Sequence, residues 1–203
     1  MSEAAQPRSS QYRKYLRFDV AVLQISSPVN YMSHIAPICL PQIGRDPEVS
    51  LNFPAHQHSL SLLQPGTIAY AAGWGAIIPD DQLGPLAFLI PKEQKRPKVL
   101  QVVDVPLIEN GECEVWHQRA GITVQLYPEM MCAGYRDGGK DSCKGDSGGP
   151  LMVRQRDGRF VLVGLVSAGF SCGKPGQPGI YHRISATADW ISYQANGGLD
   201  RRG

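Results

Sequence analysis

The stretch Gly138-Gly-Lys-Asp-Ser-Cys-Lys-Gly-Asp-Ser-Gly-Gly-Pro150 decides how this sequence folds and which chemistry it carries. Ser147 lies among glycines, whose conformational freedom allows a tight turn that exposes a hydroxyl together with its own backbone N–H. A serine exposed in this way suits a nucleophile, and the amides of Gly145 and Ser147 can donate to the oxyanion that forms in acyl transfer. The alternative interpretation is a glycine-rich turn without chemistry, but the length of the string favours the nucleophile.

Ser147 also fits the G-x-S-x-G pattern of the nucleophile elbow in α/β-hydrolases, which requires a strand before the serine and a helix after it. Residues 150–153 have the apolar pattern of a strand instead. Asp157 and His182 follow the serine in the order of that fold's triad, but Asp157 and Gly158 form a typical hairpin turn between two apolar stretches. We therefore set the elbow aside.

Short apolar stretches separated by turns predict a mainly β protein. The 203 residues are 42% hydrophobic and include 22 glycines and 16 prolines, which suits many short strands better than a helical bundle. Helical composition is confined to residues 109–119 and to a final segment that begins after Ser185. The patterning predicts strands at residues 20–25, 67–74, 99–105, 151–155 and 160–167, and the fold class is therefore expected to be all-β.

Charge and hydropathy exclude several classes of function. A net charge of +2 with 19% charged residues leaves no basic footprint for a nucleic acid. No apolar run approaches the roughly 20 residues that cross a bilayer, so we expect no membrane span. The polar opening of the chain lacks the apolar core of a signal peptide, so none is predicted in this chain.

The cysteine pattern leaves two interpretations open. Two intrachain disulfides with one cysteine left over would place the protein in an oxidising compartment, whereas five reduced thiols would place it in the cytosol. No C-x-x-C pair occurs, and His56 and His58 have no supporting carboxylates, so no metal site is expected. The five cysteines are Cys39, Cys113, Cys132, Cys143 and Cys172.

Residues 145–150, with Asp141 six residues before the serine, resemble the nucleophile loop of the chymotrypsin-type (S1) serine proteases, in their trypsin-like branch. Asp19-Val-Ala-Val-Leu23 is similar to the family's D-I-A-L-L strand, whose first residue is the triad aspartate. The resemblance runs from Asp19 to about Gln194, and the whole resembles the C-terminal part of a secreted, arthropod-type, two-chain member. Further family landmarks follow in order: Pro37-Ile-Cys-Leu-Pro41, Gly73-Trp-Gly75, Met131-Cys-Ala-Gly134, Val166-Ser-Ala-Gly169 and Pro178-Gly-Ile-Tyr-His-Arg183.

The resemblance implies a chymotrypsin-like fold, which is a double antiparallel β-barrel with a C-terminal helix. Because the similarity begins at the triad aspartate, we expect the first barrel to be largely missing from this chain. The expected division is a polar N-terminus outside the family (1–18), a remnant of the first barrel with the interdomain linker (19–65), the second barrel with the C-terminal helix (66–195), and a tail (196–203).

The resemblance also implies catalytic roles. Ser147 would be the nucleophile, the N–H groups of Gly145 and Ser147 the oxyanion hole, and Asp19 the carboxylate that orients the general base. In family zymogens, the amino terminus that activation frees forms an ion pair with the aspartate beside the nucleophile, which is Asp146 here. The implied activity is that of a trypsin-like serine endopeptidase, with no cofactor.

Asp141 would form the floor of the primary specificity pocket, with Gly169 and Gly179 as its open walls. A buried carboxylate at the end of an open slot selects an Arg or Lys side chain by a charge-assisted pair, so the implied partners are polypeptides cleaved after Arg or Lys. Ser167 to Gly169 would pair with the substrate backbone as an added strand. Ala168 stands where the family has tryptophan, which predicts a roomier neighbouring subsite.

For the cysteines, the resemblance implies the disulfides Cys113–Cys132 and Cys143–Cys172. Cys39 would be unpaired in this chain, because it matches the cysteine that ties two-chain members to an upstream activation segment. The location implied by the family is extracellular.

Two features of active family members are missing from this sequence. The general base is the histidine of an A-A-H-C motif upstream of the triad aspartate, but the 18 residues before Asp19 contain no histidine. The I-V-G-G-like start that supplies the activating amino terminus is also absent. Loss of a triad member costs about 10⁴–10⁶ in turnover, so we expect the isolated chain to be catalytically silent, as a truncated gene model, an isoform or a pseudoenzyme would be.

The histidines that are present give no obvious replacement for the base, since each is expected to be an ordinary polar residue: His34, His56, His58, His117 and His182. The alternative function is a non-catalytic serine protease homologue. Such a module would use the Asp141 pocket and the strand-pairing edge to capture basic peptides or a protease without cutting them.

Overall fold

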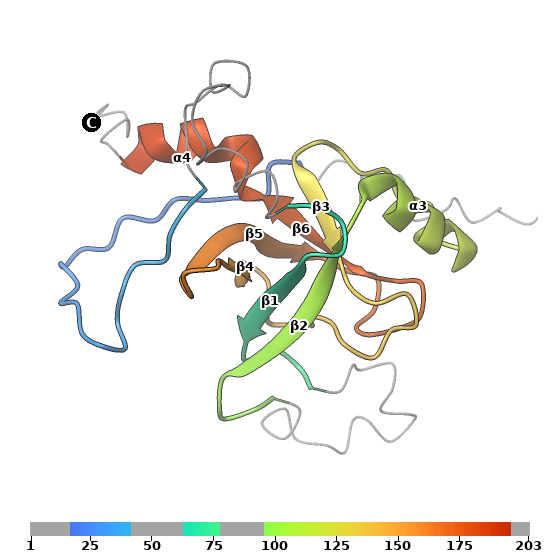
Figure 1. Ribbon diagram of the computed structural model, residues 1–203, viewed down its shortest axis with the longest axis horizontal. Helices are drawn as coiled ribbons and strands as arrows, with labels where there is room; N and C mark the ends of the chain where they lie inside the picture. Colours follow the sequence, from blue (N-terminus) through green and yellow to red (C-terminus); the bar gives the residue numbers. More distant parts are fainter. Residues whose placement is uncertain (1–16, 42–62, 78–95, 196–203) are drawn as a thin grey trace, which may run out of the picture.

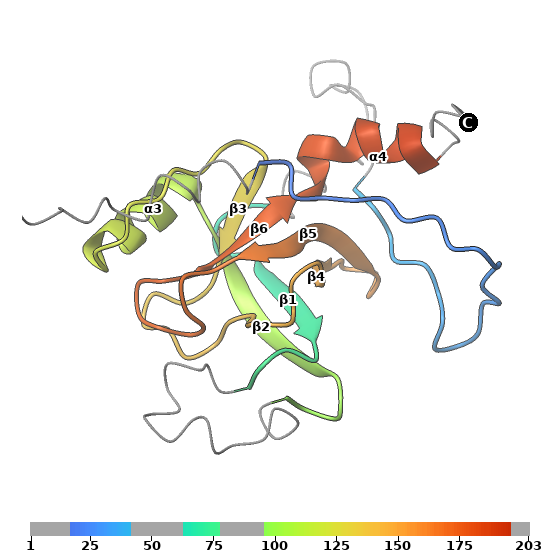
Figure 2. The same ribbon diagram turned by 180° about the vertical axis from the view of Figure 1, so that it is seen from behind.

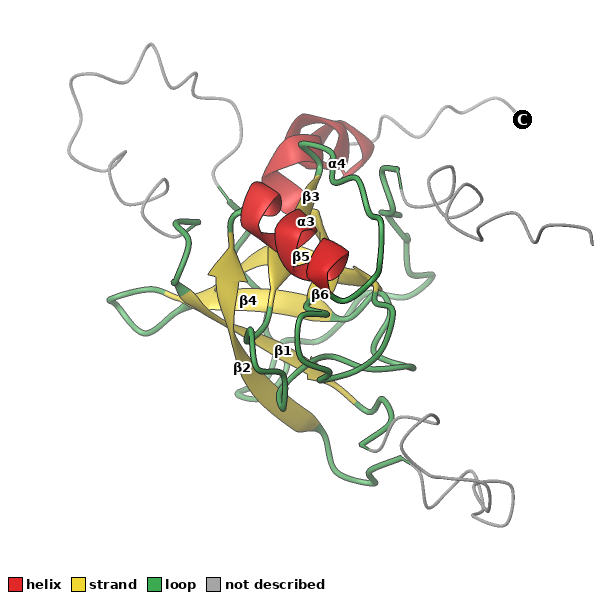
Figure 3. Cartoon of the chain, turned by 90° about the vertical axis from the view of Figure 1, so that its right-hand side faces the viewer, coloured by secondary structure: helices red, strands yellow, loops and turns green. Residues whose placement is uncertain are grey.

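Six antiparallel strands form a closed barrel in the computed structural model, which describes residues 17–41, 63–77 and 96–195 (Figure 1). The barrel closes in the order β1-β2-β3-β6-β5-β4. Figure 3 shows the two helices outside the strands. The elements are β1 (Ile68–Gly73), β2 (Gln101–Ile108), α3 (Asn110–Arg119), β3 (Met130–Ala133), β4 (Pro150–Arg154), β5 (Phe160–Ala168), β6 (Gly179–Arg183), the 3₁₀ helix η4 (Ile184–Thr187) and α4 (Ala188–Ala195).

The barrel interior is filled by small and branched apolar side chains. In β5, Val161 and Val163 point inward and are buried, while Leu162 between them is only partly buried, which is the alternation expected of a strand with one face on a core. Leu151 and Tyr181 add the largest side chains, both 0% exposed. Each such side chain contributes about 1.5–3 kcal/mol by leaving water, so the barrel is stabilised by its own core.

A second apolar cluster lies outside the barrel, where α3 covers β3 and β6. It is made by Ile108, Cys113, Met130, Cys132 and Ile180. The disulfide between Cys113 of α3 and Cys132 of β3 crosses this cluster and fixes the helix to the strand.

Most of the predicted elements are confirmed. The strands predicted at 67–74, 99–105, 151–155 and 160–167 correspond to β1, β2, β4 and β5, and the predicted helix at 109–119 corresponds to α3. The last helix begins later than predicted, because residues 184–187 first form the tighter turn of η4. The division of the chain at residues 18, 65 and 195 stays a prediction.

The prediction of a buried strand over residues 20–25 is wrong. Residues 17–41 run as an open segment that projects from the barrel (Figure 2), and residues 20–25 form no strand. Leu23 is 87% exposed and Ile25 is 62% exposed. The physical reason is that no described strand lies beside these residues to complete a ladder, so their β-branched pattern has no partner.

Candidate active site

The nucleophile loop, residues 141–149, enters β4 in a conformation that backbone hydrogen bonds fix. Gly148 N–H donates to the Val166 carbonyl at 2.8 Å, and Val166 N–H donates back to the Gly149 carbonyl at 2.9 Å. Gly145 has φ of +104°, a conformation that favours glycine, and it directly precedes Asp146 and Ser147. These bonds leave Ser147 exposed at the surface of the barrel.

The side chain of Asp146 turns into the protein and is held by two backbone amides. Gly75 N–H donates to Asp146 Oδ1 at 2.7 Å, and Cys143 N–H donates to Asp146 Oδ2 at 2.9 Å. A Cβ at Gly75 would lie 2.5 Å from Asp146 Cγ, and one at Gly73 would collide with Oδ1. The two glycines of Gly73-Trp-Gly75 are therefore needed to admit this carboxylate.

Asp141 is bound on one oxygen only. Its Oδ2 accepts a hydrogen bond from Gly173 N–H at 3.0 Å, whereas Oδ1 is buried and has no hydrogen-bond partner. Burial raises the pKa of the carboxyl to about 7, since desolvation disfavours its charged form. A cation that reaches Oδ1 would therefore stabilise the charged form of this carboxyl group.

Glycine is required beside that unpaired oxygen. A Cβ at Gly179 would lie 2.9 Å from Asp141 Oδ1, so a side chain there would fill the space in front of the carboxylate. Gly169 is less constrained, because its Cβ would meet only the Ser171 carbonyl at 3.4 Å. The structure thus brings Asp141 and Gly179 together, as the predicted floor and wall of one pocket would require.

Two polar side chains near Asp141 were not predicted from the sequence. Ser142 Oγ and Tyr181 Oη are 3.0 Å apart and hydrogen-bonded, and Tyr181 Oη lies close to Gly179. Burial raises the pKa of the Tyr181 hydroxyl, so it stays neutral. Ser142 could have been found from its place directly after Asp141, whereas the tyrosine gave no signal beyond its place in a family landmark.

Asp19 lies against β5. Ser167 Oγ donates to Asp19 Oδ2 at 2.6 Å, and both groups are on the surface. Two residues earlier, Arg17 forms an ion pair with the buried carboxylate of Glu129, and its guanidinium stacks 4.0 Å from the centre of the Tyr127 ring. The structure therefore brings the predicted triad carboxylate to the predicted strand-pairing edge.

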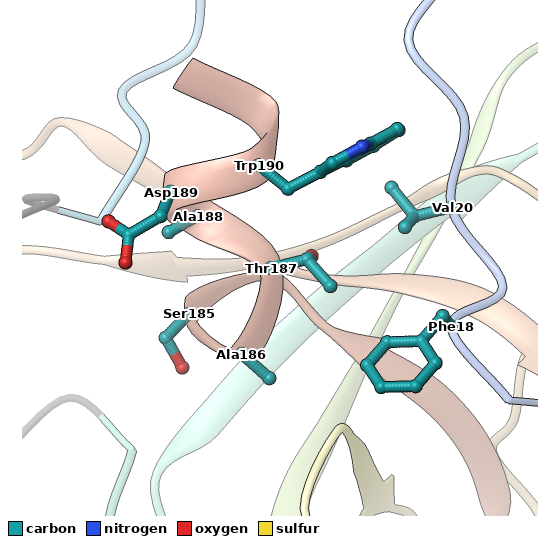
Figure 4. Close-up of a pocket in the computed structure, with 8 residues that line it drawn as sticks. All are labelled: Phe18, Val20, Ser185, Ala186, Thr187, Ala188, Asp189 and Trp190. Carbon is teal, nitrogen blue, oxygen red and sulfur yellow. The ribbon is translucent and has the colours of Figure 1, made fainter. Parts of the chain in front are cut away.

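A cavity of about 450 Å³ lies beside the residues that flank Asp19 (Figure 4). Phe18 and Val20 face Trp190 across it, and Asp189 points away from the two of them. None of the predicted site residues lines this cavity. Its lining is completed by Ser185, Ala186, Thr187 and Ala188.

No described histidine is hydrogen-bonded to Ser147. His182 is 1% exposed, and its Nε2 is 2.8 Å from Thr187 Oγ1. His117 is fully buried and donates from Nδ1 to the Cys113 carbonyl at 3.0 Å. Burial lowers the pKa of both rings. His34 is exposed, while His56 and His58 lie outside the described residues.

Both disulfides that the resemblance implied are present. Cys143 is joined to Cys172, which fixes the nucleophile loop to the segment after β5, and Cys113 is joined to Cys132. Cys39 is a partly buried free thiol, and its carbonyl accepts a hydrogen bond from Leu162 N–H at 2.8 Å.

The described residues offer neither a metal-binding cluster nor a membrane-spanning helix. His, Cys, Asp and Glu side chains form no group of three or more there that could hold a metal ion. Within the same residues, no helix is both long and apolar enough to cross a membrane.

Comparison with known proteins shows which sequences this chain is similar to. The sequence matches the family described as Trypsin over residues 5–191. It is 36% identical over 174 residues to serine proteinase stubble of Drosophila melanogaster, which covers 86% of this chain and 18% of that protein. Human testisin is 34% identical over 183 residues, covering 90% of this chain and 49% of testisin. The clotting factor G beta subunit of Tachypleus tridentatus is 32% identical over 178 residues, covering 86% and 49%. The chain therefore spans half or less of the length of these relatives.

Proposed function

Since this chain belongs to the trypsin family of serine proteases, we propose that its domain is of the type that hydrolyses polypeptides on the carboxyl side of Arg or Lys. Ser147 Oγ would attack the carbonyl carbon while its proton passes to a general base, and the amides of Gly145 and Ser147 would hold the oxyanion. Return of the proton to the leaving amine breaks the peptide bond and leaves an acyl-enzyme. Water then releases the acid and restores the serine.

The proposed specificity rests on the surroundings of the Asp141 carboxylate. Its Oδ1 is buried without a partner, and Gly179 keeps the space in front of it open. A guanidinium or ammonium group supplies both the charge and the hydrogen bonds that this oxygen lacks. An uncharged side chain would leave it unpaired, at a cost of about 1–3 kcal/mol.

Asp19 is proposed to orient the base, and its bond with Ser167 supports this role. Among the described residues, no histidine is hydrogen-bonded to Ser147, and His117 and His182 are buried against other partners. We therefore propose that the isolated chain binds substrates and does not turn them over. Ser167 and Gly169 would pair with the substrate backbone, as an added strand does.

The second candidate is a non-catalytic module that captures basic peptides or a protease. The observation that favours it is the open space at Asp141 Oδ1, combined with the lack of any histidine bonded to Ser147 among the described residues. For both candidate functions we propose an extracellular location, since the two disulfides of the chain persist in an oxidising compartment. Cys39 would then be available to an upstream activation segment.

The test compares binding with turnover in the 203-residue chain. A peptide with one internal Arg is expected to bind, and Asp141→Asn is expected to weaken binding at least about tenfold, because a charge-assisted pair is lost. Asp137→Asn, a change at an exposed aspartate four residues away, is the matched control and should leave binding unchanged. Equal affinity for the wild type and Asp141→Asn would overturn the proposed specificity.

Turnover is measured in the same preparation. A fluorophosphonate that reacts with activated serines should label Ser147 at no more than the rate of free serine. Labelling at the rate of an active trypsin would show that the chain supplies its own base, and the proposal of catalytic silence would be wrong.

A further inference from the structure

Arg96 lies against the amide proposed for the oxyanion hole. A Cβ built on Gly145 would be 3.2 Å from Arg96 Nη2 and 3.3 Å from Arg96 Cζ. Because the Cβ and the amide nitrogen are each about 1.5 Å from the Cα, the guanidinium comes within about 6 Å of the Gly145 amide nitrogen. A positive charge therefore stands beside the group that would bind the substrate's carbonyl oxygen.

The guanidinium and the Asp141 carboxylate have different surroundings. Gly145 meets Arg96 and Gly75 on one face, whereas Asp141 meets Gly173 and Gly179. The two sets of neighbours share no residue. The nucleophile loop thus contains an acidic group, Asp141, and meets a basic group, Arg96, at a different set of neighbours.

Nothing in the described part of the chain neutralises the charge of Arg96. The side chain is exposed, and among the described residues no carboxylate forms an ion pair with it. Asp146, the carboxylate beside Gly145, accepts instead from the amides of Gly75 and Cys143. A guanidinium presents parallel donors that fit a carboxylate better than any uncharged group.

We propose that the chain prefers ligands in which a basic side chain for Asp141 is followed at once by a carboxylate for Arg96. Two kinds of peptide carry this chemistry: those that end in Arg or Lys, and those in which Asp or Glu follows the basic residue. The inference rests on the proposed function, because it uses the Asp141 pocket, and it narrows the ligand class. In a chain that does not turn over substrates, the first kind is the product that an active protease releases.

The test uses the Ser147→Ala chain, so that no peptide is cut, and measures fluorescence anisotropy with labelled peptides. The peptide Gly-Ser-Gly-Arg is compared as the free acid and as the C-terminal amide. Gly-Ser-Gly-Arg-Asp-Gly is compared with Gly-Ser-Gly-Arg-Ala-Gly, both as amides. The carboxylate is expected to strengthen binding at least about threefold in one pair or in both, which is the size of a partly exposed ion pair.

Substitutions at two exposed basic residues test whether Arg96 is the source of the preference for a carboxylate. Arg96→Ala should remove the preference, and Arg96→Glu should reverse it. Lys98→Ala, a change at an exposed base two residues away, should preserve it. A preference in the first pair alone identifies the terminal carboxylate as the source, and one in the second pair alone identifies the acidic side chain. Equal affinities within both pairs, or a preference that survives Arg96→Ala, would overturn the inference.

The same measurements distinguish failure of this inference from failure of the proposed function. If Asp141→Asn abolishes binding while acid and amide bind equally, the pocket stands and the role of Arg96 is wrong. If no peptide binds the Ser147→Ala chain, or if Asp141→Asn changes nothing, both proposals are wrong.

Discussion

The barrel and the segment formed by residues 17–41 hold the two halves of the site in different ways. The loop that carries Asp141 and Ser147 is closed by a disulfide to Cys172 and by paired backbone hydrogen bonds to β5. The segment that carries Asp19 pairs with the described strands only through an isolated bridge between Cys39 and Val161, and most of its apolar side chains are exposed. The pocket is therefore a property of the barrel, whereas the position of Asp19 depends on a few side-chain contacts.

Polar contacts near both ends attach this segment to the barrel. Arg17 pairs with Glu129, Asp19 accepts from Ser167, and the Cys39 carbonyl accepts from Leu162 N–H. Between the last two contacts lie residues 20–38, whose described hydrogen bonds are local. The comparison teaches that the two proposed steps place different demands on this chain. Binding a basic side chain at Asp141 would need only the barrel, whereas hydrolysis would also need the segment that carries Asp19.

The largest expected effect contrasts one leucine from each region. Leu151→Ala removes a side chain that is 0% exposed and leaves a cavity in the barrel, so we expect a loss of about 3–5 kcal/mol in the free energy of unfolding. Leu23→Ala removes one that is 87% exposed, and the change should stay within about 0.5 kcal/mol. Urea unfolding followed by circular dichroism measures both. Comparable losses would mean that the segment shares the core of the barrel.

A second contrast concerns one aspartate from each region. The folded-state pKa of Asp141 is about 7, above the ordinary value of 3.8, so the folded protein holds a proton that the unfolded chain releases between about pH 4 and 7. Stability is therefore lost as the pH rises through this window. Asp141→Asn removes the cost of the buried charge and should raise the free energy of unfolding by at least about 1 kcal/mol at pH 8.

The pH dependence is the control for that prediction. At pH 4 the gain from Asp141→Asn should disappear, because the native carboxyl is then neutral. Asp19→Asn changes an exposed residue and should alter stability by less than about 0.5 kcal/mol at either pH. An equal gain at pH 4 and pH 8 would contradict a raised pKa for Asp141.

The same division between the two regions decides how far the sequence predicts the structure. The strands of the barrel follow from β-branched stretches and from the turn at Asp157 and Gly158, because each strand finds its neighbours in the chain. Residues 20–25 carry the same kind of pattern, yet they form no strand. A period-2 pattern states which face could be buried, and it does not state whether a partner strand is present.

What the sequence reveals of the proposed site is limited for a related reason. Motifs single out Ser147 and Asp141 as candidate residues, since the glycines around them constrain the backbone locally, and the roles of these two residues stay predictions. The contact between Arg96 and Gly145 joins positions far apart in the chain, so no local pattern could reveal it. Residues 92–98 contain four bases in seven positions, a pattern typical of a solvated loop, and only the fold distinguishes Arg96 from its neighbours in this stretch.

The smallest expected effect is local. Ser167→Ala removes the hydrogen bond to Asp19, which is worth about 0.5–1.5 kcal/mol. Because this bond is one of few that hold the segment, its loss should increase the population of detached segment without unfolding the barrel. Added chymotrypsin should therefore cut after Phe18, which directly precedes Asp19 and lines the cavity with Trp190, about twofold to tenfold faster in the variant, since cleavage follows the open population.

Cleavage within the barrel is the internal control for that experiment. Cuts at Phe160, a partly exposed residue of β5, require the barrel to open and should occur at the same rate in both proteins. If both sites are cut faster, Ser167 supports the barrel itself. If neither changes, the bond to Ser167 does not hold Asp19 in place. The triad carboxylate would then depend on Arg17 and its buried partner Glu129, and the attachment of the segment would lie before Asp19 and not at it.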